Sequence, residues 1–115
     1  MNITRHEQGK ILSHAVEHGN TVYLAGVVAE NLTQDIKGQT QQVLAEIDRL
    51  LEKCGSNKSK ILSAQIWVTD IRNRAPMNEV WNAWVDPKNV PARACVEAKL
   101  ADPTALVEIM VIAAK

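Results

Sequence analysis

The sequence predicts a single α+β domain in which two helices cover one face of a mixed β-sheet. The chain has 115 residues, which is enough for one domain with a modest core. Apolar residues recur with strand and helix periods in the order β-β-β-α-β-α-β-β. Placing both helices on one face is the economical packing for this order. There is no repeat or linker, so residues 1–115 are expected to form one unit.

Three strands are predicted before the first helix. Residues 3–5 can form a short strand, and residues 12–18 and 21–25 are typical of a hairpin around Gly19-Asn20. Gly26 then follows the hairpin at a position where a backbone or a ligand can approach closely.

A long helix over residues 35–54 is the clearest periodic signal in the chain. Gly55 is a good C-terminal stop for it. One side of this segment is polar, whereas the other carries apolar residues at helical spacing, which predicts a buried stripe: Ile36, Val43, Leu44, Ile47, Leu50 and Leu51.

Two further strands and a second helix complete the predicted order. Residues 61–69 alternate as a strand, residues 75–85 form a helix with Pro76 in its first turn, and residues 105–113 form the last strand. Between the second helix and the last strand lies one more strand, over residues 92–98.

This strand, which follows Pro91, carries an arginine in its middle. Alternation places Arg93, Cys95 and Glu97 on one face. Burying a guanidinium is costly unless an anion meets it, so we expect a protein or ligand carboxylate opposite Arg93. The other face is small and apolar, which predicts that it packs against the helices: Ala92, Ala94, Val96 and Ala98.

Glu108 is a lone carboxylate in an apolar row of the last strand. Two interpretations stay open: a structural Arg93–Glu108 ion pair, or a site in which Arg93 meets the carboxylate of a ligand. The sheet face without helices would carry Trp67, Cys95 and one side of the last strand. A half-apolar uncovered face indicates oligomerisation.

Other residues offer weaker signals for chemistry. Cys95 is a possible nucleophile, although a thiol in mid-strand is more often inert. His14 and His18 would lie about 13 Å apart on a strand, too far to share a metal. Trp81 and Trp84 fit a core or interface, and Trp84 is the better pocket-wall candidate because it lies close to the loop that leads to the arginine strand.

Composition and motifs argue against several functional classes. Zero formal net charge, no basic run and few aromatic residues do not indicate a nucleic-acid partner. No segment resembles a signal peptide or reaches the roughly 20 apolar residues of a membrane span. His6 has no visible partner, Cys54 and Cys95 form no metal-type pair, and no phosphate loop or zinc motif is present. We therefore expect a reduced, cytoplasmic protein.

Several short stretches together resemble the Rid family of reactive intermediate/imine deaminases, also called YjgF. The resemblance covers nearly the whole chain and is most specific where residues 91–96 (PARACV) are followed by residues 107–109 (VEI). Residues 52–59 and 82–85 carry a closer likeness to the YoaB-type branch. Further matching stretches are residues 19–26, 39–40 and 77–81.

The resemblance implies a homotrimer of chorismate-mutase-like subunits, with the sheets forming an inner barrel and the helices outside. It implies pockets between subunits, each containing Arg93. The family activity is hydrolysis of enamines and imines, such as 2-aminoacrylate, to 2-keto acids and ammonia. No metal or organic cofactor takes part.

The resemblance also implies roles for individual residues. Arg93 would grip the substrate carboxylate, and Glu108 would orient or activate the attacking water. Backbone groups near Cys95 would bind the carboxylate or the nitrogen, and Asn78 matches a pocket asparagine of the family.

The chain departs from the main branch of the family at two pocket positions. Leu12 stands where active deaminases have a tyrosine, and Ala25, beside Gly26, stands where they have a serine. The loss of both hydroxyls predicts weaker deamination or a preference for imines with a larger apolar side chain. It also leaves open a non-catalytic trimer that binds a keto acid.

Overall fold

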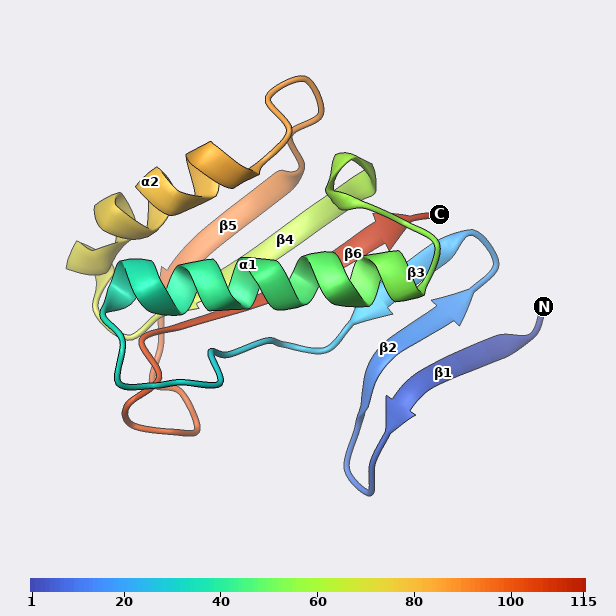
Figure 1. Ribbon diagram of the computed structural model, residues 1–115, viewed down its shortest axis with the longest axis horizontal. Helices are drawn as coiled ribbons and strands as arrows, with labels where there is room; N and C mark the ends of the chain where they lie inside the picture. The colour runs from blue at the N-terminus through green and yellow to red at the C-terminus, as the bar shows by residue number, and fades with distance from the viewer.

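A six-stranded mixed sheet with two helices on one of its faces forms the structure, a computed structural model that describes residues 1–115 (Figure 1). The spatial order of the strands is β1-β2-β3-β6-β4-β5, and only the β4–β5 pair is parallel. The predicted α+β class and element order are confirmed. The elements are β1 (Ile3–Gln8), β2 (Ser13–His18), β3 (Thr21–Leu24), α1 (Ile36–Lys53), β4 (Ile61–Val68), α2 (Arg74–Trp84), β5 (Ala92–Glu97) and β6 (Val107–Ala114), with 3-10 turns at Lys58–Lys60 and Ile71–Asn73.

Strand β1 is longer than predicted. It pairs with β2 from Ile3 opposite His18 to Gln8 opposite Ser13, whereas the sequence indicated only residues 3–5. The added residues are polar, so they carry no apolar alternation from which a strand can be recognised. Strand β1 forms one edge of the sheet and β5 forms the other.

Helix α1 supplies most of the covering layer. Its predicted apolar stripe is buried against the sheet, with Val43, Ile47 and Leu50 fully inaccessible. Asp35 caps its N-terminus by accepting a hydrogen bond of 2.8 Å from the Gly38 amide. Gly55, at a φ of +75°, turns the chain away just after its last residue.

The register of the central strands shows which sheet face lies under the helices. On β4, Ala64 and Ile66 are buried in the core, and they lie directly opposite Arg93 and Cys95 of β5. Directly opposed residues point to the same side of a sheet. Arg93 and Cys95 therefore face the helices, and the prediction that the alanine side of β5 packs there was wrong.

The opposite face of the sheet has no helix over it, and we call it the open face. Trp67 and Glu108, which lie opposite one another on β4 and β6, belong to this face. Tyr23, Val96 and Met110 are exposed there. The predicted uncovered, half-apolar face is confirmed, with Trp67 on it but without Cys95.

Neither helix has the length and apolar character needed to cross a lipid bilayer.

Candidate functional site

Arg93 is held in place without an acidic partner. It lies in the middle of β5, is half-buried, and its Nη1 donates a hydrogen bond of 2.7 Å to Oδ1 of Asn78. Its guanidinium carbon lies 5.2 Å from the centre of the Trp81 ring. None of the ion pairs in the chain includes Arg93. Burial lowers the pKa of Arg93, and Arg74 acts in the same direction, so an anion beside the guanidinium would be favoured.

Helix α2 positions the two side chains that hold this arginine. Asn78 and Trp81 are three residues apart and therefore project from the same side of the helix. Trp81 is almost fully buried and packs against Trp84, with 5.4 Å between ring centres. The amide and the indole thus form a rigid support for the guanidinium.

Trp84, predicted as a pocket wall near Arg93, takes part in a different feature. Its Nε1 donates a hydrogen bond of 2.9 Å to Oδ2 of Asp48 on α1, and the Lys58 ammonium lies 5.4 Å from its ring centre. It lines an outer groove between α1 and α2. The sequence did not identify Trp81 as the aromatic neighbour of Arg93, although its three-residue spacing from Asn78 on a helix indicates that both side chains share one face.

Cys95 lies two residues after Arg93 on the same face of β5. It is partly exposed and packs against the edge of the core. The structure therefore brings together Arg93, Cys95 and Asn78, with Trp81 beside them, under the helix layer.

Glu108 lies on the open face and makes close contact with Gly26. A Cβ atom added to Gly26 would overlap Oε2 of Glu108, so any other residue here would push the carboxylate aside. Two backbone hydrogen bonds between Val27 and Ile109, of 2.9 and 3.1 Å, fix this approach. The predicted close approach at Gly26 is confirmed, but the approaching group is a side chain of the same chain rather than the backbone or ligand that the sequence suggested.

Arg93 and Glu108 lie on opposite faces of the sheet. Their strands flank β4, where Ala64 opposite Arg93 is on the helix side and Trp67 opposite Glu108 is on the open side. A structural ion pair between them within one chain, one of the two sequence-based interpretations, was therefore wrong. The ion-pair interpretation was wrong because alternation shows only which residues of one strand share a face. It does not show which face of one strand lies on the same side of the sheet as a given face of another strand.

The remaining predicted residues accompany Glu108 rather than Arg93. The Ala25 amide donates a hydrogen bond of 3.0 Å to the His14 carbonyl just beyond β3, and Leu12, half-exposed, precedes β2. Continuing the alternation through Tyr23 and His14 places Ala25 and Leu12 on the open face. The candidate residues thus form two groups on opposite faces.

Comparison with known proteins gives consistent matches along the chain. A family model described as "Endoribonuclease L-PSP" matches residues 5–115. A RutC family protein of Haemophilus influenzae is 48% identical over 114 residues, which cover 98% of each chain. The RutC family protein YoaB of Escherichia coli is 46% identical over 114 residues, which cover 99% of each chain.

Solved structures agree with these matches. A member of the YjgF protein family from Neisseria meningitidis has a TM-score of 0.98 at 44% identity, over 100% of this chain and 96% of the other. A protein of the conserved Rid family from Yersinia pestis, described as of unknown function, has a TM-score of 0.86 at 32% identity, over 94% and 90% of the two chains.

Proposed function

Because this chain belongs to the Rid family, also called YjgF or RutC, we propose that it is an enamine/imine deaminase that hydrolyses reactive 2-imino acids to 2-keto acids and ammonia. Arg93 is the proposed anchor for the substrate carboxylate.

The observation that carries this proposal is the unpaired guanidinium of Arg93. The Asn78 oxygen occupies one of its N–H donors, which leaves other donors for a planar carboxylate. A bidentate pair would fix both the position and the plane of a 2-imino acid, whose reacting carbon is bonded to that carboxylate.

Two copies of the chain are needed to complete the proposed pocket. Arg93 and Glu108 are separated by the sheet, so a substrate bound by Arg93 would meet a Glu108 from a neighbouring copy. The open face supports association because it exposes Tyr23, Val96 and Met110. We propose the homotrimer implied by the family, with Arg93, Asn78 and Cys95 from one subunit and the second group of residues from the next.

The proposed chemistry is an addition of water followed by loss of ammonia. The water oxygen bonds to the iminium carbon while the Glu108 carboxylate accepts a proton from the water. The same carboxyl returns that proton to the nitrogen of the tetrahedral adduct. The C–N bond then breaks, ammonia leaves with the bonding electron pair, and loss of the hydroxyl proton gives the keto acid. Imines hydrolyse readily, so positioning supplies most of the required assistance.

Leu12 and Ala25 set the expected limits of this activity. Both side chains are apolar, and Ala25 directly precedes Gly26, which contacts Glu108. They favour imino acids with an apolar side chain over the smallest substrates. They also support a second candidate function, a trimer that binds a keto acid without turning over imines.

We expect no nucleic-acid partner because the formal net charge of the chain is zero.

The test is ammonia release from 2-imino acids generated in place by an amino-acid oxidase. We expect Arg93→Ala to lower kcat/KM by about 10²–10³-fold, because a charged, partly desolvated contact is lost. Arg72→Ala is the matched control, since Arg72 is exposed and pairs only with Asp70. Unchanged turnover in Arg93→Ala would reject the anchor, and tight keto-acid binding without turnover by the wild type would select the second function.

A further inference from the structure

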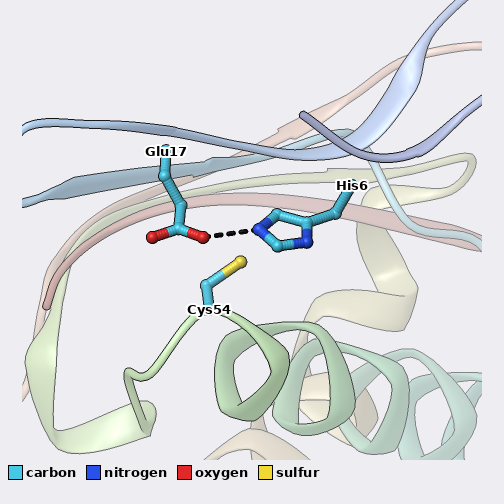
Figure 2. A group of neighbouring side chains, drawn as sticks. All are labelled: His6, Glu17 and Cys54. Carbon is cyan, nitrogen blue, oxygen red and sulfur yellow. Dashed lines mark hydrogen bonds and ion pairs between the residues drawn. The ribbon is translucent and has the colours of Figure 1, made fainter. Parts of the chain in front are cut away.

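Three side chains that can bind a metal meet on the helix side of the sheet, away from Arg93. They are His6 of β1, Glu17 of β2 and Cys54 at the C-terminus of α1 (Figure 2). His6 Nε2 is 2.5 Å from Glu17 Oε2, and the ligand atoms of all three residues lie within 4.8 Å of one another.

The fold brings these residues together from three separate elements. His6 lies opposite the fully buried Ala15, and Glu17 follows Ala15 by two residues, so both side chains point toward the helices. The Cys54 amide donates to the carbonyls of Leu50 and Leu51 at the end of α1. Its thiol lies beside the His6 and Glu17 side chains (Figure 2).

The cluster is shielded from solvent, unlike an ordinary group of surface acids. Cys54 is only 3% exposed, and the side chains of His6 and Glu17 are 18% and 14% exposed. Lys115 contacts the other oxygen of Glu17, with Nζ 2.6 Å from Oε1, and covers this side of the cluster.

We propose that His6 Nε2, Glu17 Oε2 and Cys54 Sγ bind a divalent transition-metal ion, with Zn²⁺ as the preferred ion. Imidazole nitrogen, carboxylate oxygen and thiolate sulfur are the donors that Zn²⁺ uses, and three protein ligands leave a fourth position for water. The thiolate and the carboxylate supply two negative charges, and the carboxylate also faces the Lys115 ammonium.

The distances fit the ion after a small adjustment. Bonds of about 2.0–2.3 Å in a tetrahedral site separate ligand atoms by roughly 3.3–3.7 Å. The His6–Glu17 contact therefore opens by about 1 Å through side-chain rotation. Lys115 keeps its hold on Oε1, so Glu17 binds the ion through Oε2 alone.

Binding also moves protons. Cys54 must lose its thiol proton to become a ligand, and the hydrogen between Nε2 and Oε2 must move to Nδ1 or to solvent. Affinity for the ion will therefore fall as the pH is lowered. The bound ion would connect the edge strand β1 to the end of α1 and stabilise the hairpin that β1 forms with β2.

The test uses the full chain after chelation, titrated with Co²⁺ and with Zn²⁺. We expect one ion per chain, a thiolate-to-Co²⁺ charge-transfer band, and a rise in Tm of about 5–10 °C with excess Zn²⁺ that EDTA reverses. Cys54→Ala should abolish the band. Glu17→Gln, which keeps the shape of the side chain, should retain the band and weaken binding by about 10–100-fold.

Cys95→Ala and His18→Asn are the matched controls, since each removes a cysteine or histidine outside the cluster. Both should bind the ion as the wild type does. A band that disappears in Cys95→Ala but persists in Cys54→Ala would overturn the proposal. The absence of both a band and a Tm shift in the wild type would also overturn it. None of these readouts depends on deamination, so the proposed function is tested separately.

Discussion

Gly26 shows how a single residue position controls the candidate site. Its lack of a side chain lets the Glu108 carboxylate lie against the backbone, where a Cβ atom would be 2.1 Å away. The sequence indicated a close approach at Gly26 but not its partner. That partner is supplied by β6, which is more than 80 residues away in the chain and reaches Gly26 only through the bridge between Val27 and Ile109.

Gly26→Ala is expected to displace the Glu108 carboxylate. Deamination should fall by about 10–100-fold because the proton acceptor is misplaced. The unfolding free energy should change by less than about 1 kcal/mol, because the displaced group is the far end of a flexible side chain. Gly9→Ala is the control, because its Cβ would meet only the Leu12 carbonyl at 3.7 Å. Kinetics and urea denaturation measure the two effects. Wild-type deamination by a folded Gly26→Ala variant would show that the position of Glu108 is unimportant.

Helix α1 is tied to the start of β6 by a buried glutamine. Gln39 is fully buried; its Nε2 donates to the carbonyls of Gln34 and Thr104, each at 3.1 Å, and its Oε1 accepts from the Leu106 amide at 2.8 Å. Such a side chain satisfies backbone groups that have no partner in a helix or sheet.

Gln39→Ala is expected to lower the unfolding free energy by about 2–4 kcal/mol, because it leaves buried backbone groups without partners. Urea denaturation measures this loss. Gln41→Ala, at an exposed position on the same helix, should change stability by less than about 0.5 kcal/mol. Equal small effects of the two changes would mean that water replaces the lost hydrogen bonds.

A second connection between elements joins β1 to α1 and depends on pH. Glu7, at a φ of 51°, interrupts the alternation of β1, and its carboxylate reaches Arg49 at 2.8 Å and Lys53 at 3.0 Å. Hydrogen bonds from Arg49 and then Lys53 lower the pKa of Glu7 to about 2. Because the pKa of Glu7 is lower in the folded chain than its unfolded value of 4.5, the charged carboxylate stabilises the fold above pH 4.5. That stability is lost as the pH falls from 4.5 toward 2.

Glu7→Gln should therefore lower Tm at pH 6, and its difference from the wild type should shrink between pH 4.5 and 2. Thermal melts across this range measure the difference. Glu52→Gln, an exposed change near the end of α1, serves as the control. A Tm difference that did not change with pH would mean that Glu7 acts through its backbone conformation rather than its charge.

Most of the fold was predictable at the element scale, but the orientation of β5 was not. The helices, the alternating strands and the uncovered face follow from local periodicity. Alternation along β5 placed Arg93 and the alanines on opposite faces of the strand, but it did not show which of the two faces lies under the helices. That choice depends on α2, whose Asn78 and Trp81 accommodate the guanidinium, and on the register with β4. Both are long-range features that a local pattern does not contain.

At the scale of the whole molecule, the two groups of candidate residues, around Arg93 and around Glu108, do not form one site within a single chain. Arg93 lies under the helices and Glu108 on the open face, so the proposed active site requires two subunits.

Mixing two inactive variants tests this requirement directly. Arg93→Ala and Glu108→Ala chains are unfolded together at equal concentration, refolded, and assayed for deamination. In randomly mixed trimers, about a quarter of the sites combine an intact Arg93 with an intact Glu108 from the neighbour, so about a quarter of the wild-type activity should return. Each variant refolded alone should remain inactive. No recovery in a mixture shown to contain mixed trimers would contradict a site shared between subunits, because it would mean that both residues must come from the same chain.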